Sequence, residues 1–327
     1  MKTSELVGLD LAMREIGEVE AAIEGLVASR NALIPQVHQH LIQAGGKRLR
    51  PRLTILAAKS LGECDERAIL FAAMVELTHL ASLMHDDIVD DSATRRGKPS
   101  VSARWSNGVA VLVADWLIAT ISHELIAQGE GTALGVITGA VRSMCEAELL
   151  HLEQRARTWE LPEAVYLEIV RDKTGALMAA ACELGALAGG ATDEQTEALR
   201  AFGFAMGTAF QIQDDLLDLT GDAATLGKPV GTDIAMGQLT LPVLYALENS
   251  SDGLLDQLRA AVTVTSPDEL DLPRLRALVD EAGGLAYSQM AARRYTDEAV
   301  AQLASLPPGP ATDALRELAE RAIRREA

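Results

Sequence analysis

The sequence contains little cysteine and few aromatic residues, and each shortage excludes a class of protein. The three cysteines, Cys64, Cys145 and Cys182, are odd in number and show no CxxC spacing, which argues against a disulfide framework and against a structural zinc site. Only 3% of the residues are aromatic, whereas 48% are hydrophobic. Such a core is built from Ala, Leu, Val and Ile, and disordered or fibrous classes are excluded.

Positive charge is also scarce. The 327 residues include 29 Lys and Arg against 47 Asp and Glu, which gives a formal net charge of −18 at pH 7. A surface of this sign repels phosphate backbones, so the composition argues against a nucleic-acid partner.

Long apolar runs are absent from the sequence. The first twenty residues carry four Glu and one Asp and no apolar core of a secretory signal. The most apolar stretches, residues 108–121 and 174–191, are interrupted by Asp115 and Glu183 and fall short of the ~20 apolar residues that a membrane helix requires. We therefore expect a cytoplasmic protein without a transmembrane segment.

Apolar residues recur at intervals of three and four, for instance at Leu70, Met74, Leu77 and Met84, which is the periodicity of helices. Prolines and glycine clusters stand between such segments. We expect roughly ten or more helices, the last one over residues 313–325. Because no joint has the length or composition of a linker, residues 1–327 are predicted to form a single all-α domain.

An apolar helix that ends in DDxxD occurs twice, at residues 83–91 and 210–219. The copies are too far apart for a solenoid repeat, so we interpret them as two sides of one site. An acidic cluster on a helix is most often a solvated face, but apolar neighbours give both helices a buried face, where an unpaired carboxylate is costly. Residues i and i+4 share one side of a helix. This spacing pairs Asp86 with Asp90 and Asp214 with Asp218, and Asp87 and Asp215 lie alongside.

Oxygen ligands without His or Cys favour Mg²⁺, which binds through one or two carboxylates together with substrate phosphates. Four of the six lysines lie in glycine-rich or motif-like contexts, at residues 45–51, 95–99, 173–175 and 227–229. In an acidic protein, basic residues flanked by glycine indicate phosphate contact, although surface charges in loops are the alternative. The predicted ligand is therefore a phosphate ester bound with Mg²⁺.

Taken together, the motifs resemble the trans-isoprenyl diphosphate synthases (polyprenyl synthetases), most closely those that make medium and long chains. They occur in the family's order and are GGKRLRP at 45–51, HDDIVDDSATRRGKPS at 85–100, DKTG at 172–175, FQIQDDLLDLTGD at 210–222 and GKPVGTDIAMGQLTLP at 227–242. The resemblance implies an isoprenoid synthase fold, an antiparallel helical bundle around a deep central cavity. It also implies a homodimer, with the two aspartate-rich helices facing each other at the mouth of the cavity.

The resemblance further implies a role for each matching residue. The carboxylates implied to hold Mg²⁺, about three ions per active site, are Asp86, Asp87, Asp90, Asp214, Asp215 and Asp218. The residues implied to meet the allylic diphosphate are Arg95, Lys173, Thr174, Gln211 and Lys228, among which Lys173 and Lys228 count as catalytic together with Asp86, Asp87, Asp90, Asp214 and Asp215. The residues implied to bind isopentenyl diphosphate are Lys47, Arg50, His79 and Arg96.

Such a site ionises an allylic diphosphate. Mg²⁺ and basic side chains neutralise the leaving pyrophosphate, the double bond of isopentenyl diphosphate attacks the carbocation, and a proton is lost. No protein nucleophile is needed. His79 by itself would more often be a core histidine, and His85 and His151 are interpreted as structural.

Two departures from the family pattern leave alternatives open. Gln238 replaces a lysine that is frequent in the family, and His151 stands where many members have glutamine. A non-catalytic or partner subunit of a heteromeric synthase is one alternative. A terpene cyclase is another, although a cyclase needs neither the second DDxxD nor the GGKRLRP pocket.

The length of the product is predicted from the helix before Asp86. In the family, a bulky aromatic residue four or five positions earlier stops the growing chain, but here those residues are Ser82 and Ala81. A deeper residue, Trp116 or Ile118, would then close the cavity. We expect a polyprenyl diphosphate longer than geranylgeranyl diphosphate, with geranylgeranyl diphosphate itself as the alternative.

Overall fold

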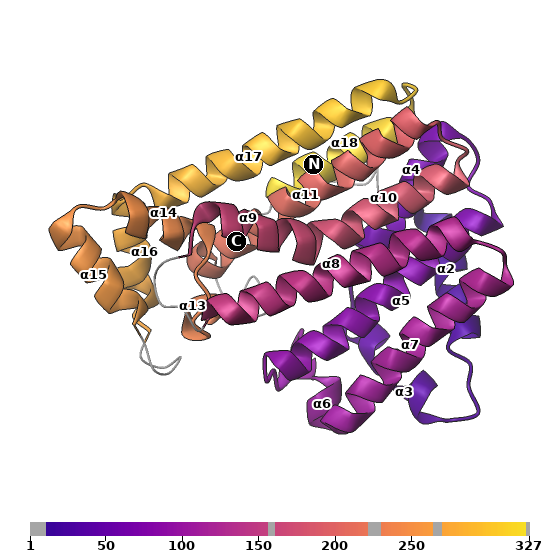
Figure 1. Ribbon diagram of the computed structural model, residues 1–327, viewed down its shortest axis with the longest axis horizontal. Helices are drawn as coiled ribbons and strands as arrows, with labels where there is room; N and C mark the ends of the chain where they lie inside the picture. Colours follow the sequence, from indigo (N-terminus) through magenta and orange to yellow (C-terminus); the bar gives the residue numbers. More distant parts are fainter. Residues whose placement is uncertain (1–10, 156–160, 222–229, 264–269, 325–327) are drawn as a thin grey trace, which may run out of the picture. The chain divides into compact units, whose positions relative to one another are not determined.

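The computed structural model in Figure 1 describes residues 11–155, 161–221, 230–263 and 270–324. Within these ranges the regular structure is helical apart from two strands of two residues each. The predicted all-α fold class is therefore confirmed. The chain divides into two compact units, the first made of residues 1–141, 177–203 and 302–318, the second of residues 142–176, 204–301 and 319–327. The single domain over residues 1–327 stays a prediction.

The first unit contains most of the N-terminal half of the chain. Its complete elements are α2 (Met13–Leu26), α3 (Leu33–Gln43), α4 (Leu49–Leu61), α5 (Glu66–Val89), β1 (Thr94–Arg95), β2 (Lys98–Pro99), α6 (Val101–Arg104), α7 (Asn107–Ala127) and η3 (Leu303–Ser305). Parts of α8 (Gly131–Arg155), α10 (Ala176–Ala188), α11 (Asp193–Thr220) and α18 (Pro310–Ile323) also belong to it.

Helix α5 is the core helix of the first unit, and it carries the first aspartate motif at its end. The Asp65 carboxylate accepts a hydrogen bond from the Ala68 amide at 3.0 Å and so caps the helix start. Ala and large apolar residues such as Phe71 and Met74 are completely buried along it. The helix ends at Val89, where Asp91 adopts a left-handed φ of 48°. Packing of α5 against α2, α4 and α7 holds the motif in place.

Small residues let the helices of this unit approach closely, which compensates for the shortage of aromatic side chains. A Cβ atom on Gly185 of α10 would lie 2.3 Å from the Thr54 carbonyl oxygen of α4. A Cβ atom on Gly189 would lie 2.8 Å from the Ala58 carbonyl oxygen. The backbones of α4 and α10 are thus in direct contact, as interiors packed to high density require.

The motif that contains Arg95 and Lys98 forms a tight hairpin. Arg95 pairs with Lys98 across β1 and β2, and the two residues between them, Arg96 and Gly97, have φ values of 50° and 74°. Positive φ at both central residues is the geometry of a type I′ turn, which explains the glycine. The hairpin presents Arg95 and Arg96 in succession.

Helices α5 and α7 are long and apolar enough to cross a membrane if length and composition are the only criteria, with mean hydropathy of 1.5 and 1.7. In α5, 67% of the apolar window is buried inside the fold, as expected of a core helix. In α7 only 33% is buried. The apolar stretch at residues 108–121 is only part of α7, which continues to Ala127. The absence of a transmembrane segment and the cytoplasmic location stay predictions.

The second unit holds the second aspartate motif, near the end of α11. Its complete elements are α9 (Glu163–Val170), the π-helical turn η1 (Arg171–Gly175), α13 (Thr232–Ala235), α14 (Leu241–Asn249), α15 (Asp252–Val262) and α16 (Leu272–Glu281), together with nearly all of α17 (Gly284–Gln302). Its core joins Ile212 and Leu216 of α11 to Leu241 and Leu275.

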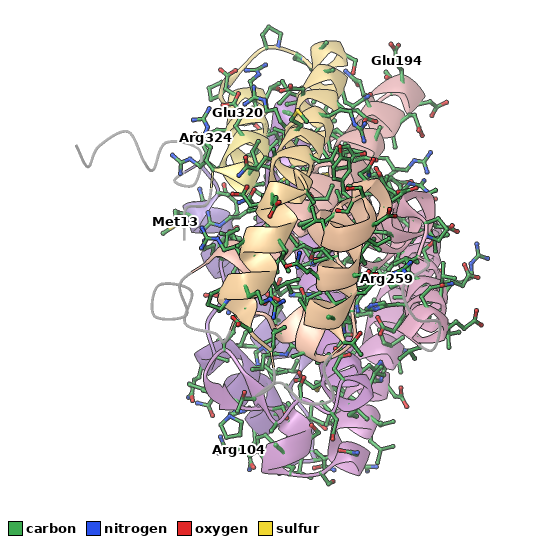
Figure 2. The ribbon with its side chains drawn as sticks, turned by 90° about the vertical axis from the view of Figure 1, so that its left-hand side faces the viewer. Met13, Arg104, Glu194, Arg259, Glu320 and Arg324 are labelled. Carbon is green, nitrogen blue, oxygen red and sulfur yellow. The ribbon has the colours of Figure 1, made fainter. Side chains whose placement is uncertain are left out.

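Many charged side chains lie on the outside of the helices. Figure 2 shows Glu194, Arg259, Glu320 and Arg324 pointing away from the ribbon. Glu320 and Arg324 form an ion pair at 2.7 Å, one turn apart on α18. Exposed pairs of this kind contribute about 0–1 kcal/mol, so they do not determine the fold.

Candidate active site

The first aspartate motif places one carboxylate in the protein interior and two near its surface. Asp87 is 1% exposed, and its Oδ1 accepts from Nε and Nη2 of Arg95, each at 2.8 Å. Its Oδ2 is buried without a hydrogen-bond partner in the described part of the chain. Asp86 and Asp90 are half-buried and lie one turn apart. The structure therefore brings Arg95 into direct contact with the predicted metal-binding motif.

The carboxylate oxygens of the first aspartate motif are suitable ligands for Mg²⁺. Among the described residues, no three side chains of His, Cys, Asp or Glu converge into a group that could enclose a metal ion. Mg²⁺ does not need one, since it binds through one or two carboxylates, phosphate oxygens and water. The buried Oδ2 of Asp87 lacks a donor, and a nearby cation would satisfy it. Asp86, Asp87 and Asp90 are thus suited to a metal ion held jointly with a phosphate ester.

A basic cluster adjoins this motif within the first unit. Arg50 Nη1 lies 3.2 Å from His79 Nε2. Burial lowers the pKa of His79 well below its ordinary value, and the neighbouring Arg50 lowers this pKa further. The imidazole is therefore neutral and accepts a hydrogen bond from the guanidinium. Arg50 and His79, two residues predicted for the same diphosphate, are in contact.

The hairpin connects the basic cluster to the glycine loop before α4. Arg96 Nη1 donates to the Gly45 carbonyl oxygen, and Lys98 Nζ donates to the Gln43 carbonyl oxygen at 2.7 Å. A Cβ atom on Gly46 would lie 2.8 Å from Nη1 of both Arg48 and Arg96, so both guanidinium groups pack on this glycine. Lys47 follows and is exposed. Two basic motifs about fifty residues apart thus form one surface.

Arg48 and Glu76 belong to this cluster although neither was predicted. Arg48 Nη1 lies 3.5 Å from Glu76 Oε1, and Glu76 is 4% exposed. Burial raises the pKa of Glu76, while Arg48 and Arg50 act in the opposite direction. The sequence gives only a weak indication of these two residues. Glu76 stands one helical turn before His79, and Arg48 lies inside the GGKRLRP motif.

In the second unit, a glycine contact sets the position of Thr174. A Cβ atom on Gly207 of α11 would lie 2.5 Å from the Gly175 Cα, so α11 touches the backbone of the π-helical turn. Thr174 Oγ1 can then donate to Gln211 Oε1 at 2.9 Å. The short π-helical segment occurs in a predicted functional motif, as such segments frequently do. The structure brings Thr174 and Gln211 together.

Asp215 is the centre of a buried hydrogen-bond network. Its Oδ1 accepts from Gln211 Nε2 at 2.8 Å, and its Oδ2 accepts from the Tyr166 hydroxyl at 2.5 Å. Burial, followed by the charge of Asp233, raises the pKa of Asp215 to about 8. Tyr166 was not predicted, because α9 carries no recognisable motif around it.

Asp218 is engaged in local structure. Its Oδ1 accepts from the Thr232 hydroxyl at 2.9 Å and its Oδ2 accepts from the Asp233 amide at 3.1 Å, at the start of α13. The side chain is 2% exposed, whereas Asp214 is half-buried. A metal ion at Asp218 would have to replace hydrogen bonds that hold α13.

Lys173 lies beside a cavity of about 100 Å³ in the second unit, and Lys173 Nζ contacts Glu148 Oε2 at 2.5 Å. The residues that line this cavity include His151, Tyr166, Lys173, Thr174, Gln211, Asp215, Asp233 and Gln238. His151 and Gln238, two positions at which the sequence departs from the family pattern, are thus next to predicted site residues. Lys228 lies outside the described residues.

The residues predicted to limit chain length lie on α5 and α7, which pack together in the first unit. Ala81 is 1% exposed, and the Ser82 hydroxyl donates to the His79 carbonyl oxygen at 2.9 Å, so it is directed back along the helix. Trp116 and Ile118 are half-buried on α7. Positions 81 and 82 therefore carry small side chains and no aromatic ring.

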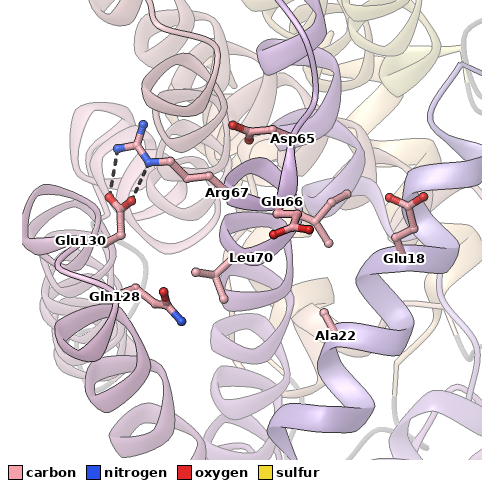
Figure 3. A pocket seen from close by; sticks show the side chains of 9 residues that line it. Glu18, Ala22, Asp65, Glu66, Arg67, Leu70, Gln128 and Glu130 are labelled. Atoms are coloured by element: carbon pink, nitrogen blue, oxygen red, sulfur yellow. Dashed lines mark hydrogen bonds and ion pairs between the residues drawn. The ribbon is translucent and has the colours of Figure 1, made fainter.

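A separate cavity of about 780 Å³ lies at the start of α5 (Figure 3). Arg67 and Glu130 form a two-fold ion pair beside it, with Nε–Oε1 and Nη2–Oε2 distances of 2.6 and 3.0 Å, and Glu18, Asp65 and Glu66 also line it. By the helical rise, it is about 30 Å from the aspartate motif at the other end of α5. None of the predicted site residues lines this cavity.

Comparisons with known proteins agree on one family. The family model for polyprenyl synthetase matches residues 31–278. The chain is 38% identical over 309 residues to heptaprenyl diphosphate synthase component 2 of Geobacillus stearothermophilus, covering 93% of this chain and 94% of the relative. It is 34% identical over 317 residues to octaprenyl diphosphate synthase of Escherichia coli (strain K12), covering 97% and 98%.

A solved structure matches over nearly the whole chain as well. The polyprenyl synthase of Caulobacter crescentus, complexed with calcium and isoprenyl diphosphate, superposes with a TM-score of 0.90 at 38% sequence identity. The match covers 98% of each chain.

The raised pKa of Asp215 predicts a pH effect on stability in protein freed of metal ions with a chelator. The folded chain keeps a proton on Asp215 up to about pH 8, whereas an unfolded chain releases it near 3.8. The folded state thus binds more protons between these values, so this group's contribution to the free energy of unfolding falls as pH rises. Urea unfolding at pH 5 and pH 8 should show wild type losing stability relative to Asp215→Asn. Parallel pH profiles would contradict the assignment.

Proposed function

The chain belongs to the polyprenyl synthetase family and is a trans-prenyl diphosphate synthase, and we propose that it condenses isopentenyl diphosphate with an allylic diphosphate into a polyprenyl diphosphate longer than geranylgeranyl diphosphate. The observation that carries this proposal is the hairpin of the first unit. Its consecutive arginines contact two different parts of the predicted site, Arg95 the buried Asp87 of the aspartate motif and Arg96 the Gly45 carbonyl oxygen of the glycine loop. A reaction that joins two diphosphates requires two such groups close together.

The allylic diphosphate is assigned to the aspartate motifs. In the first unit, Asp86, Asp87 and Asp90 would hold Mg²⁺, and Arg95 would meet the diphosphate. In the second unit the same role falls to Asp214, Asp215, Asp218, Lys173 and Lys228, with Thr174 and Gln211 beside the reacting carbons. Bound Mg²⁺ would neutralise charge on the leaving pyrophosphate. Lys173, at present paired with Glu148, would exchange that carboxylate for phosphate oxygens.

Isopentenyl diphosphate is assigned to Lys47, Arg50, His79 and Arg96. The neutral His79 and the charged Arg50 already share a hydrogen bond, so their orientation is set before the substrate arrives. The double bond of the held substrate attacks the allylic cation, and the departing pyrophosphate takes the proton. No described residue needs to act as a nucleophile in this scheme.

A long product is supported by the small side chains on α5 and by the relatives. With side chains as small as Ala81 and Ser82, the chain pocket below the aspartates would stay open, and Trp116 or Ile118 on α7 would end it. The relatives named above are described as heptaprenyl and octaprenyl synthases. Geranylgeranyl diphosphate remains the shorter alternative, while the family assignment leaves a terpene cyclase without support.

A subunit of a heteromeric synthase is the second candidate function, because the relative from Geobacillus stearothermophilus is called component 2. The pure chain should be incubated with Mg²⁺, isopentenyl diphosphate and each allylic primer in turn, and the products measured by mass spectrometry. Product from the chain alone supports an autonomous enzyme. No product with any primer would favour the subunit.

We also propose a homodimer that forms through α7. This helix exposes Val111, Leu112 and Ile126 by 38%, 70% and 65%. Large exposed apolar side chains near both ends of a helix are typical of a surface covered by another protein chain. Light scattering measures the mass of the particle and tests the assignment.

Both carboxylate motifs should be essential for turnover. Loss of Asp86 or Asp214 leaves the charge of the leaving group partly unneutralised, so Asp86→Ala and Asp214→Ala should each lower kcat by about 10² or more at saturating Mg²⁺. Asp280→Ala, an exposed carboxylate on α16, is the control and should keep the wild-type rate. A folded Asp86→Ala or Asp214→Ala variant with normal kcat would disprove the metal assignment.

Gln238 lines the same cavity as Lys173, so a cation there should assist diphosphate binding. Gln238→Lys is expected to lower the KM for the allylic substrate, since it adds a charge-assisted contact. Steady-state kinetics should show the KM for isopentenyl diphosphate unchanged. An unaltered allylic KM would mean that position 238 does not reach the diphosphate.

Ala81→Phe should shorten the product. An aromatic ring in place of a buried methyl group would close the chain pocket one turn below Asp86, so the product should lose several five-carbon units while the first condensation continues. Product analysis by mass spectrometry measures this, and a thermal melt shows whether the larger side chain is accommodated. The pocket is wrongly assigned if a folded variant releases the same products as wild type.

A further inference from the structure

Glu76 is a buried carboxylate among the arginines of the first unit, and no role in the proposed reaction requires it. It is 4% exposed and lies on α5 one turn before His79. Moving a carboxylate out of water is costly unless a partner compensates for it. Its place in the interior therefore depends on the basic residues around it.

The direct partner of Glu76 is Arg48, at an Oε1–Nη1 distance of 3.5 Å. Arg48 is itself largely buried, with a side chain 10% exposed, and its Nε contacts Glu20 Oε1 at 3.2 Å. Glu20 is 48% exposed, so water screens that contact far more. Arg48 is thus held between an inner and an outer carboxylate, and water screens the inner contact less.

Arg48 also occupies an unusual backbone position. Its φ of 49° is left-handed, a region that few residues other than glycine adopt, and it is the residue immediately before α4. Such a conformation persists only where surrounding contacts impose it. The side-chain contacts to Glu76 and Glu20 contribute to this, together with the hydrogen bond that the Arg48 carbonyl oxygen accepts from the Arg52 amide at 3.1 Å.

Through Gly46, the position of Arg48 affects the predicted diphosphate site. The guanidinium groups of Arg48 and Arg96 both pack on Gly46, and two like charges this close repel each other. The negative charge of Glu76 opposes that repulsion, and it acts on Arg50 and Arg96 as well as on Arg48. The carboxylate therefore stabilises the arrangement of all three arginines.

We propose that Glu76 is a positioning residue, which holds Arg48 and, by way of the Gly46 loop, Arg96 in the geometry that receives the diphosphate of isopentenyl diphosphate. Glu76 itself does not touch the substrate. This inference rests on the proposed function, because it assumes that the basic cluster binds that diphosphate.

Positioning and simple electrostatics predict opposite results for the loss of this charge. If Glu76 acted only through its charge, its removal would make the site more positive, and the diphosphate would bind more tightly. If Glu76 positions the arginines, its removal lets them separate, and the diphosphate binds more weakly. The sign of the change in KM therefore distinguishes the two roles.

The test is steady-state kinetics of Glu76→Gln against Glu20→Gln. These variants make the same substitution in two carboxylates that share the partner Arg48, but only Glu76 is buried. For Glu76→Gln the KM for isopentenyl diphosphate should rise about tenfold, with kcat and the allylic KM within about twofold of wild type. Glu20→Gln should change none of the three by more than about twofold, and Glu76→Asp should recover part of the loss.

A double-variant cycle tests the path through Arg48. Arg48→Gln should raise the same KM, and adding Glu76→Gln to it should cause no further increase, since both act through one contact. If Glu76→Gln proves unstable in a thermal melt, Glu76→Asp and Arg48→Gln still decide the question. An unchanged or lower KM, or additive effects, would overturn the inference.

If the proposed function is wrong, the experiment gives a different result from the one that overturns the positioning role. In that case the wild-type chain would form no product, and calorimetric titration with isopentenyl diphosphate would replace the kinetic measurement. Weaker binding to Glu76→Gln than to Glu20→Gln would still support the positioning role, and equal or tighter binding would overturn it.

Discussion

Burial of charge is the constraint on which the rest of the site depends. Asp87, Glu76 and Asp215 are all less than 5% exposed, and each contacts a specific donor: Arg95, Arg48 or the Tyr166 hydroxyl. An acidic chain could place such carboxylates on its surface at no cost. Their burial, with partners present, is what groups the scarce basic residues into a single surface in the first unit and orders Gln211 and Thr174 in the second.

Because the basic residues already have these internal partners, the affinity for a substrate depends on the difference between their contacts with the substrate and their contacts within the protein. Lys173 contacts Glu148, and Arg95 contacts Asp87, before any diphosphate is bound. A diphosphate bound as we propose would compete with those carboxylates and would gain only the excess of its interaction over theirs. Cations that already have partners stay oriented, which reduces the conformational entropy lost when the substrate binds.

The shortage of aromatic residues has a consequence for the geometry of the site. Helices built from Ala, Leu and Gly approach more closely than helices with bulky side chains, as α10 does against α4 at Gly185. In the second unit the same kind of contact, between Gly207 and Gly175, brings Thr174 within 2.9 Å of Gln211. Close backbone packing therefore sets distances between functional side chains.

The sequence by itself determined the helical fold class, the two aspartate motifs and the family, because helical periodicity and motif spacing are local properties. It also indicated that the motifs at 45–51 and 95–99 bind phosphate. It did not reveal Arg48 with Glu76, Lys173 with Glu148 or Tyr166 with Asp215. These partners are separated by tens of residues, and only tertiary packing decides which buried charges meet. Asp218 shows the same limit, since no motif predicts its hydrogen bonds to Thr232 and Asp233 at the start of α13.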